Sequence, residues 1–257
     1  MARVLVTGSA DGLGLIAAQL LIEEGHEVTL HARSEQRAQA ALAAAPGAQA
    51  TLAGDLASIA EVRELAGAAN RLGRYDAVIH NAAVGYREPR IETVDGLEHV
   101  FAINVLAAYL LTALLARPQR LVFLSSGMHR GGDPEAADLQ WERRTWNGSQ
   151  AYAESKFWDA VLAFALARRW PQTVSNAVEP GWVATKMGGP GAPDDLVLGA
   201  VTQVWLAVSE EPAALVSGRY LFHKQPHETH PALADEKVQE RLLADCEELT
   251  GTSLQAA

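Results

Sequence analysis

The sequence lacks the features of an exported protein. Its 257 residues include one cysteine, Cys246, which excludes an internal disulfide and a metal site built from several cysteines. The N-terminal stretch MARVLVTGSA enters an apolar, strand-like run at once. It shows no basic segment, apolar core or cleavage signature of a leader peptide. We therefore expect a cytoplasmic protein.

Basic residues are also few. The chain has 21 Lys and Arg against 31 Asp and Glu, which gives a net charge of -10. A surface of this sign repels phosphate backbones and anionic lipids. The longest apolar run, 99–116, is near the lower length limit for a membrane span and contains Asn104 and Thr112, so we predict a buried helix there. We expect no nucleic-acid partner and no membrane.

What the sequence does contain is an alternation of short apolar runs and longer helical patterns. With 49% hydrophobic and 20% charged residues, the composition predicts one globular domain over 1–257. Runs rich in Val, Ile and Leu predict strands at 3–8, 27–32, 48–55, 75–83, 119–126, 173–181 and 218–223. Helical patterns lie between them at 12–24, 34–45, 58–72, 95–117, 149–170 and 193–209.

This alternation predicts an α/β fold. The helices are long enough to connect parallel strands, and continuously apolar strands indicate a sheet covered on both faces. We predict a Rossmann-type, doubly wound parallel sheet of about seven strands. Two segments do not fit the alternation: an insertion at 127–148 and a C-terminal tail at 223–257, where we expect a short amphipathic helix at 233–249.

A glycine turn follows the first predicted strand. In TGSADGLG, Gly8, Gly12 and Gly14 open a helix. Glycine allows a tight turn and a close approach of the backbone to a ligand, and the free amides of a helix N-terminus favour a pyrophosphate. The position between a strand and a helix therefore predicts a dinucleotide site rather than a merely structural turn.

The end of the second strand indicates which dinucleotide is bound. It reads LHARS, with no carboxylate for the ribose diol of NAD. Arg33 is placed to bind a 2′-phosphate, and such an ion pair is worth up to about 4 kcal/mol before desolvation. We predict NADP (NADPH), with NAD possible because Asp11 would repel the phosphate and Glu35 could bind a diol. Arg33 could also be a solvated surface cation.

Tyr152 and Lys156 are four residues apart in the predicted helix 149–170. That spacing places both side chains on one helix face. A free tyrosine has a pKa near 10, and lowering it to ~7 takes roughly 4 kcal/mol. A nearby ammonium and an oxidised nicotinamide ring could supply this, which predicts acid–base chemistry. The alternative is a core tyrosine beside a lysine that extends to solvent.

A third polar group stands at the end of the strand LVFLSS, where Ser126 follows Ser125. With this serine the chain resembles the short-chain dehydrogenase/reductase family from Ala2 to about Tyr220. The matching positions are the glycine pattern of Thr7, Gly8, Gly12 and Gly14, the Asn-Ala-Ala element of Asn81, Ala82 and Ala83, the helix Asn104, and Ser126, Tyr152 and Lys156.

The resemblance implies a role for each matching position. Tyr152 would be the general acid in reduction and the base in oxidation, and Ser126 would orient the carbonyl. Lys156 would also bind the nicotinamide ribose, and Asn104 would hold a proton-relaying water. The implied cofactor contacts further include Asp55 at the adenine, Pro180, Gly181 and Thr185 near the nicotinamide, and Leu13, Leu56 and Val183. Asp55 could instead cap a helix, a role for which Ser58 competes.

The 26-residue spacing from Ser126 to Tyr152 is similar to that of retinol dehydrogenases and of relatives of protochlorophyllide reductase. Bulky side chains predict a pocket for a large, mostly apolar carbonyl compound or alcohol, with walls from Tyr86, His129, Trp141, Trp146, Trp182 and Met187. The tryptophans could equally attach the insertion to the domain. We expect no metal site, since the histidines of HKQPHETH lie in a loop.

The helices at 99–116 and 149–170 are apolar nearly all round. A helix that packs on a sheet needs only one apolar stripe. Their outer faces must be covered by a second subunit or by the insertion, and we predict a homodimer through these helices.

The sequence therefore predicts an NADP-dependent oxidoreductase that reduces a ketone or aldehyde, or oxidises the alcohol in reverse. Two alternatives stay open at this point. One is a cofactor-sensing binding protein without turnover, and the other is an epimerase or dehydratase that works through a transient ketone.

Overall fold

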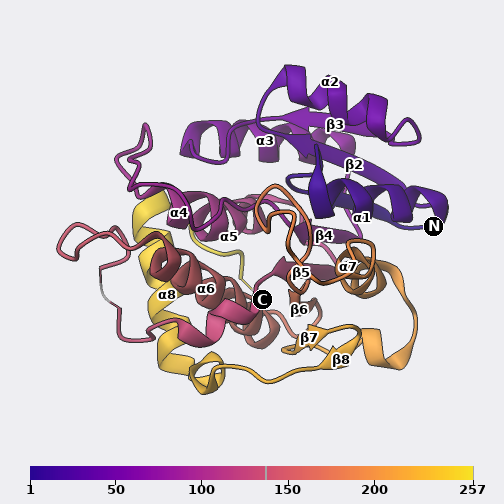
Figure 1. Cartoon of the computed structure of the whole chain (residues 1–257). Helices are drawn as coiled ribbons and strands as arrows, with labels where there is room; N and C mark the ends of the chain where they lie inside the picture. The colour runs from indigo at the N-terminus through magenta and orange to yellow at the C-terminus, as the bar shows by residue number, and fades with distance from the viewer. Residues whose placement is uncertain (137, 257) are drawn as a thin grey trace.

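The computed structural model describes residues 1–136 and 138–256. Eight strands in these residues form one sheet in the order β3-β2-β1-β4-β5-β6-β7-β8 (Figure 1). Their bounds are Arg3–Val6 (β1), Glu27–Ala32 (β2), Ala50–Ala53 (β3), Ala77–His80 (β4), Arg120–Leu124 (β5), Val174–Glu179 (β6), Tyr220–Phe222 (β7) and Gln225–Pro226 (β8). All neighbours run parallel except β7 and β8.

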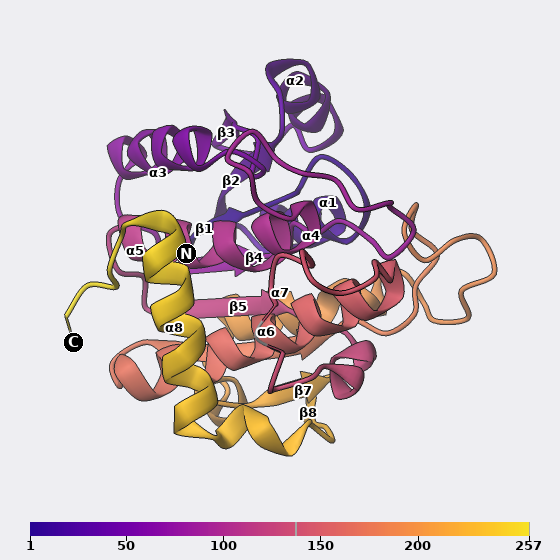
Figure 2. The ribbon, with the colours of Figure 1, turned by 90° about the vertical axis from the view of Figure 1, so that its left-hand side faces the viewer.

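Helices cover both faces of the sheet (Figures 1 and 2). One apolar core lies under α1 (Gly12–Glu23), α2 (Glu35–Ala44) and α7 (Leu198–Val208). The other lies under α3 (Ile59–Leu72), α5 (Ala107–Leu114) and α6 (Gly148–Arg169). Side chains alternate along each strand, so the same strands contribute side chains to both cores. In β1, Leu5 packs in one core and Val6 in the other.

The strand order reverses between β1 and β4. From β1 the chain moves outward to β2 and β3, then returns to β4 on the opposite side. The connections therefore diverge at the carboxyl ends of β1 and β4, which is where ligands bind in open parallel sheets. The glycine turn follows β1, and Asn81 follows β4.

The predicted fold class and all seven strands are confirmed. The sequence pattern missed β8, which has two residues and pairs antiparallel with β7. It also missed a break in the predicted helix 95–117, which begins as α4 (His99–Phe101), passes through a π-helical segment, η1 (Ala102–Leu106), and continues as α5.

The insertion at 127–148, apart from Ala137, which lies outside the described residues, is held by several side chains. It opens with a short 3₁₀ helix, η2 (Gly127–Gly131). Arg144 forms a bidentate pair with Glu154 of α6 at 2.8 Å for both bonds. Trp146 donates its indole N–H to the carbonyl oxygen of Glu88 at 3.1 Å. The insertion is therefore attached to α6 and to the segment after β4.

The C-terminal tail supplies the cover that the apolar outer faces of α5 and α6 require. Helix α8 (Glu236–Thr250) packs against α6 and, less extensively, α5 (Figure 2). Its buried side chains include Val238, Leu242 and Leu243, which join the core under α6. The homodimer stays a prediction. The apolar outer faces of α5 and α6, which suggested it, are covered by α8 of the same chain.

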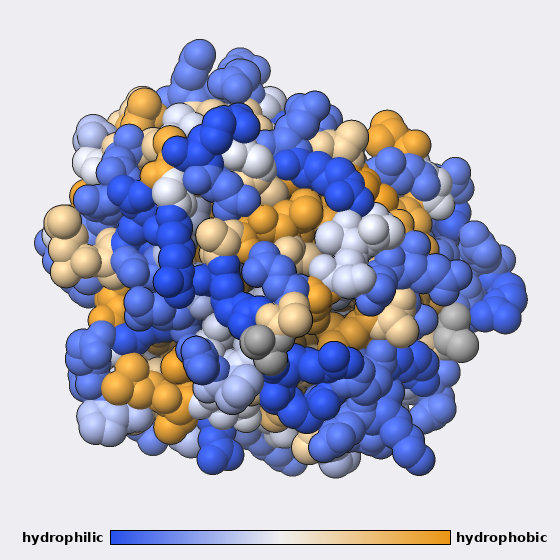
Figure 3. Space-filling model, turned by 180° about the vertical axis from the view of Figure 1, so that it is seen from behind, coloured by the Kyte–Doolittle hydropathy of each residue, from blue (hydrophilic) through white to orange (hydrophobic). Residues whose placement is uncertain are grey.

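No helix in the described residues is long and apolar enough to cross a membrane. Figure 3 shows one face of the molecule from behind, where hydrophobic areas are broken up by hydrophilic residues.

Candidate active site

The glycine turn has the backbone conformation that its sequence predicts. Gly8 and Gly12 have φ angles of 63° and 55°, in the left-handed region that favours glycine. Asp11 occupies the N-cap position of α1, but its side chain makes no capping hydrogen bond. The first amides of α1 are thus left for a ligand, and an anion at this helix end is stabilised by the helix dipole.

Thr7 and Asn81 fasten this turn to the end of β4. The Thr7 hydroxyl accepts hydrogen bonds from the backbone N–H groups of Asn81 and Ala82 at 3.0 and 3.1 Å. The Asn81 amide donates to the carbonyl oxygens of Thr7 and Gly8 at 2.9 and 3.2 Å. Both side chains are engaged with the protein, so they shape the site at the switch point of the sheet.

His31 is a supporting residue that the sequence analysis missed. It is buried at the end of β2, where its Nδ1 accepts from the Gly8 N–H and its Nε2 lies 3.0 Å from the Gly54 carbonyl oxygen. This pattern requires the neutral ring with the proton on Nε2. Burial lowers the pKa of His31, which keeps that neutral form.

Asp11 does not act as an isolated negative charge. Arg37 donates to its Oδ2 at 2.8 Å and Lys186 to the same oxygen at 2.7 Å. Arg33, which precedes Arg37 in the sequence, is exposed and lies directly after β2. The repulsion expected between Asp11 and a 2′-phosphate is thus offset by two cations, and Arg37 and Lys186 join Arg33 as candidate phosphate ligands.

The segment after β3 shows whether Asp55 or Ser58 caps α3. Ser58 caps α3, accepting from the Glu61 N–H at 3.4 Å, whereas Asp55 accepts from the Ala57 N–H at 2.9 Å. Asp55 is therefore in a turn and is not the N-cap of α3.

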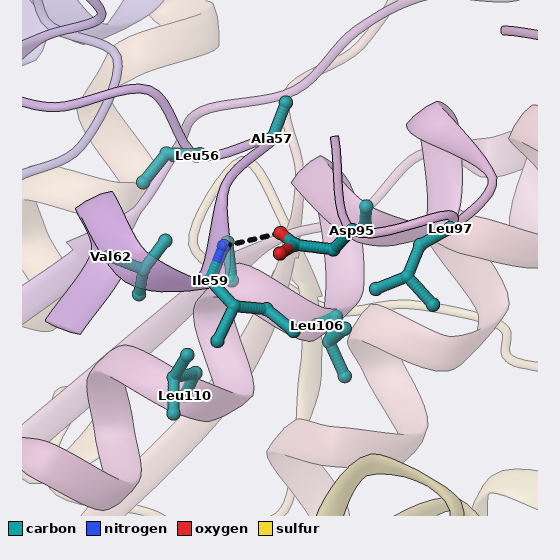
Figure 4. Close-up of a pocket in the computed structure, with 10 residues that line it drawn as sticks. Leu56, Ala57, Ile59, Val62, Asp95, Leu97, Leu106 and Leu110 are labelled. Carbon is teal, nitrogen blue, oxygen red and sulfur yellow. Dashed lines mark hydrogen bonds between the residues drawn. The ribbon is translucent and has the colours of Figure 1, made fainter. Parts of the chain in front are cut away.

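A small pocket opens beside this turn (Figure 4), with Leu56 in its wall. Its walls are mostly apolar, and the Asp95 carboxylate in it accepts from the Ile59 N–H at 2.7 Å. Since that polar group is already bonded to the protein, the pocket offers little for ligand recognition.

The structure brings Ser126, Tyr152 and Lys156 together. Ser126 follows β5 directly, and Tyr152 and Lys156 lie on α6. The Tyr152 hydroxyl lies close to the Ser126 side chain, and the Lys156 Nζ lies 5.8 Å from the centroid of the Tyr152 ring. The neighbouring Ser125 instead donates to the carbonyl oxygen of Lys156 at 2.7 Å, so it fixes α6 against β5.

The surroundings of Tyr152 within the protein favour its protonated form. Burial raises the pKa of its hydroxyl, which Lys156 and Ser126 only partly counteract. A second charge, Asp159, raises it further. Tyr152 is therefore a neutral phenol at pH 7 in this structure, which is the form that can donate a proton.

Asn104 lies in the π-helical segment η1, an arrangement often found at functional sites. Its Nδ2 donates to the Ser155 hydroxyl at 2.9 Å and to the Val84 carbonyl oxygen at 3.2 Å, and its Oδ1 accepts from the Val84 N–H at 2.8 Å. Its side chain connects α6 to the segment after β4, and both amide hydrogens are used. The water-holding role stays a prediction.

The loop after β6 reaches the glycine turn. A methyl group added at Gly12 would lie 3.7 Å from Thr185 Cγ2, and Gly181 has a φ of 84°. Pro180 follows Glu179 at the end of β6, and Val183 is buried. This loop therefore lies beside the glycine turn.

Glu179 is held beside the loop by neighbours that balance its charge. Its Oε2 accepts from the Tyr220 hydroxyl at 3.1 Å and lies 3.8 Å from an Arg130 guanidinium nitrogen.

Among the six predicted pocket residues, Tyr86 packs against Tyr152, and Met187 packs beside Gly85, the residue before Tyr86. The Tyr86 and Tyr152 rings are 5.7 Å apart, edge to face. Met187 packs at Gly85, where an added methyl group would lie 2.9 Å from its Cγ. Trp182 is 57% exposed, with its indole N–H on the Gly188 carbonyl oxygen, so it could cover a substrate only from the outer side.

The other three are occupied by packing. Trp141 is buried, and its ring contacts Trp146 and the Arg144 guanidinium. Trp146 attaches the insertion through Glu88, as described above. His129 is fully buried, with Nδ1 2.8 Å from the Ser126 carbonyl oxygen and Nε2 accepting from the His230 N–H at 3.3 Å. Trp141 and His129 therefore do not present a surface to a substrate.

The buried histidines predict a loss of stability in acid. Burial lowers the pKa of His80, in β4, from 6.5 to about 3. Below pH 6.5 the unfolded chain binds a proton that native His80 does not, so the free energy of unfolding should fall by up to about 1.4 kcal/mol per pH unit from this residue alone. Urea unfolding between pH 7 and 4.5 measures the slope. His80→Gln should flatten it, whereas exposed His223→Gln should leave it unchanged. Equal slopes in all three proteins would contradict the assignment.

No group of three or more His, Cys, Asp or Glu side chains in residues 1–136 and 138–256 is arranged to hold a metal ion.

Comparison with known proteins agrees with this geometry. Residues 2–134 match the model of the short chain dehydrogenase family. The short-chain dehydrogenase chyC of Penicillium rubens is 41% identical over 259 residues, covering 100% of both chains. Human retinol dehydrogenase 13 is 32% identical over 285 residues, covering 96% of this chain and 84% of its own length.

A solved structure with a similar fold comes from Mycobacterium paratuberculosis and has been described as uncharacterized. It superimposes with a TM-score of 0.87 at 26% identity, covering 99% of this chain and 95% of its own. From the family match and the full-length relatives together, this chain belongs to the short-chain dehydrogenase/reductase family of oxidoreductases and resembles its retinol dehydrogenase-like members.

Proposed function

We propose that this protein is an NADP(H)-dependent reductase of ketones or aldehydes on bulky apolar molecules, with the alcohol oxidation as the reverse reaction. The observation that carries the proposal is that Ser126, Tyr152 and Lys156 come together at the same sheet edge as the glycine turn.

The residues of the glycine turn fit a dinucleotide. The uncapped amides of α1 suit the pyrophosphate, and Arg33, Arg37 and Lys186 provide positive charge where a 2′-phosphate would bind. The loop at Pro180–Thr185 would contact the nicotinamide, and Asp55 and Leu56 the adenine. When bound, the nicotinamide supplies or accepts the hydride.

Ser126, Tyr152 and Lys156 would bind the carbonyl oxygen and supply the proton. Ser126 and Tyr152 would both hydrogen-bond that oxygen, which orients the carbonyl and polarises it. As negative charge develops on the oxygen, the Tyr152 hydroxyl donates its proton, and the Lys156 ammonium stabilises the resulting phenolate. In the reverse direction the phenolate accepts the proton from the alcohol.

The substrate class rests on Tyr86, whose ring packs edge to face against Tyr152, and on Met187, whose thioether packs beside Gly85. Such surfaces bind apolar ligands. The name of one relative, retinol dehydrogenase 13, refers to a bulky apolar alcohol, which supports the same class here. We further propose a small-molecule partner, with no nucleic acid and no membrane, and a cytoplasmic location.

Cofactor preference gives a separate prediction. Arg33→Ala should raise the Kd for NADPH by about tenfold or more and leave the Kd for NADH nearly unchanged, because a charge-assisted hydrogen bond to phosphate is worth about 1.5–3 kcal/mol. Fluorescence titration with each cofactor measures this. Arg71→Ala, on exposed α3 surface, is the control. Equal effects of Arg33→Ala on both cofactors would show that Arg33 does not bind the 2′-phosphate.

A panel of apolar aldehydes and ketones with NADPH and NADH tests the function. Consumption of NADPH with formation of the alcohol supports a reductase. Cofactor binding without consumption across the panel would instead indicate a sensing protein. Conversion of a hydroxylated substrate without net NADPH consumption would indicate an epimerase or dehydratase.

A further inference from the structure

Lys156 has a charged partner that its assigned role does not require. Its Nζ donates to Asp159 Oδ2 and to the Leu124 carbonyl oxygen, each at 2.8 Å. The Lys156 and Asp159 side chains are only 3% and 4% exposed. A buried ion pair of this kind has a high desolvation cost, so removing one partner changes the local charge strongly.

Two of the three N–H donors of Lys156 are engaged, one by Asp159 and one by the Leu124 carbonyl oxygen. The Leu124 carbonyl ends β5, and Asp159 lies one turn further along α6. The ammonium is thus fixed between the strand that delivers Ser126 and the helix that delivers Tyr152. One N–H donor is left for a cofactor ribose.

We propose that Asp159 is a positioning residue that holds the Lys156 ammonium against β5 and offsets its positive charge at the Tyr152 hydroxyl. This inference rests on the proposed function, since it concerns the same proton donor. Its consequence is a site in which the neutral phenol, the form needed for reduction, persists to higher pH than the lysine alone would allow.

Groups from three segments of the chain face the Tyr152 hydroxyl. Tyr152 is faced by Lys156 and Asp159 from α6, by Ser126 after β5 and by Tyr86 from the segment after β4. Burial raises the pKa of Asp159 to about 6 even with Lys156 beside it, so the carboxylate is ionised at and above neutral pH. Below pH 6 its protonation would remove the offset.

The test is the ionisation of Tyr152 in the cofactor-free protein. The ultraviolet difference spectrum against the matching Tyr152→Phe protein isolates the phenolate signal during an alkaline titration. Asp159→Asn keeps a polar side chain of the same size and removes the charge. We expect the midpoint to fall by about one pH unit, a tenfold larger ionisation constant. An unchanged or higher midpoint would overturn the proposal.

Three further variants separate charge from structure. Asp159→Glu keeps the charge and should retain the wild-type midpoint. Glu154→Gln removes another buried carboxylate of α6, the one paired with Arg144, and should leave the midpoint unchanged even if it destabilises the fold. If Asp159→Asn does not fold, Asp159→Ser removes the same charge and carries the same prediction.

A second readout uses turnover. In NADPH-dependent reduction, the alkaline limb of the pH profile of kcat/KM should shift by about one unit toward lower pH in Asp159→Asn. If wild-type protein reduces no carbonyl compound, the proposed function fails, while the titration without cofactor still decides the role of Asp159.

Discussion

Tyr152→Phe should lose turnover by about 10²- to 10⁴-fold in kcat while keeping its affinity for NADPH. The substitution removes only the hydroxyl beside Ser126 and keeps the ring that packs against Tyr86. Since the developing alkoxide then has no proton donor, the chemical step slows, but the glycine turn is unaffected. NADPH consumption and fluorescence titration measure the two properties.

A matched control is Tyr109→Phe. The Tyr109 hydroxyl is also in the interior, where it donates to the Thr252 carbonyl oxygen at 2.8 Å. Its loss should lower the free energy of unfolding by about 1 kcal/mol and leave kcat unchanged. Normal turnover in Tyr152→Phe would show that another group donates the proton.

Gly14→Ala should impair both cofactor binding and stability. A methyl group at Gly14 would lie 2.4 Å from Asn81 Nδ2 and 2.5 Å from the carbonyl oxygen of Gly8. The glycine turn between β1 and α1 would have to shift, at a cost of about 1–3 kcal/mol in the free energy of unfolding. We expect the Kd for NADPH to rise at least tenfold, since about 1.4 kcal/mol corresponds to that factor.

Gly67→Ala controls for the loss of a glycine. Gly67 is in α3, and an added methyl group would lie 3.6 Å from Arg71 Nη1, an ordinary contact distance. This substitution should stabilise the protein by about 0.5–1 kcal/mol and leave NADPH affinity unchanged. Urea unfolding and fluorescence titration check both variants. Wild-type affinity in Gly14→Ala would contradict a cofactor site at this turn.

The sheet could be predicted because its strands are continuous apolar runs between clear breaks. β8 could not, since Gln225–Pro226 has neither length nor an apolar pattern. The π-helical segment at Asn104 also left no sequence signal, because its hydrophobic residues follow the same spacing as those of the flanking helices.

Contacts between distant segments account for what the sequence did not reveal at the site. Asp11 and Arg37 are 26 residues apart, and Asp11 and Lys186 are 175 apart, so only the folded chain shows that the acid is neutralised. The burial of His129 and Trp141 depends on the insertion and the tail, which have no repeating pattern. Asp159 is different: its spacing of three from Lys156 allowed a pair, but only the structure shows both side chains buried.

Transfer of deuterium from NADPH to a carbonyl carbon is the direct test of the proposed reductase activity. Wild-type protein is incubated with an apolar aldehyde or ketone and NADPH that carries deuterium on either face of C4 of the nicotinamide. We expect an alcohol with deuterium on the former carbonyl carbon from one face only, and almost no product with Tyr152→Phe. An alcohol that contains no deuterium from either labelled cofactor would contradict the proposed activity.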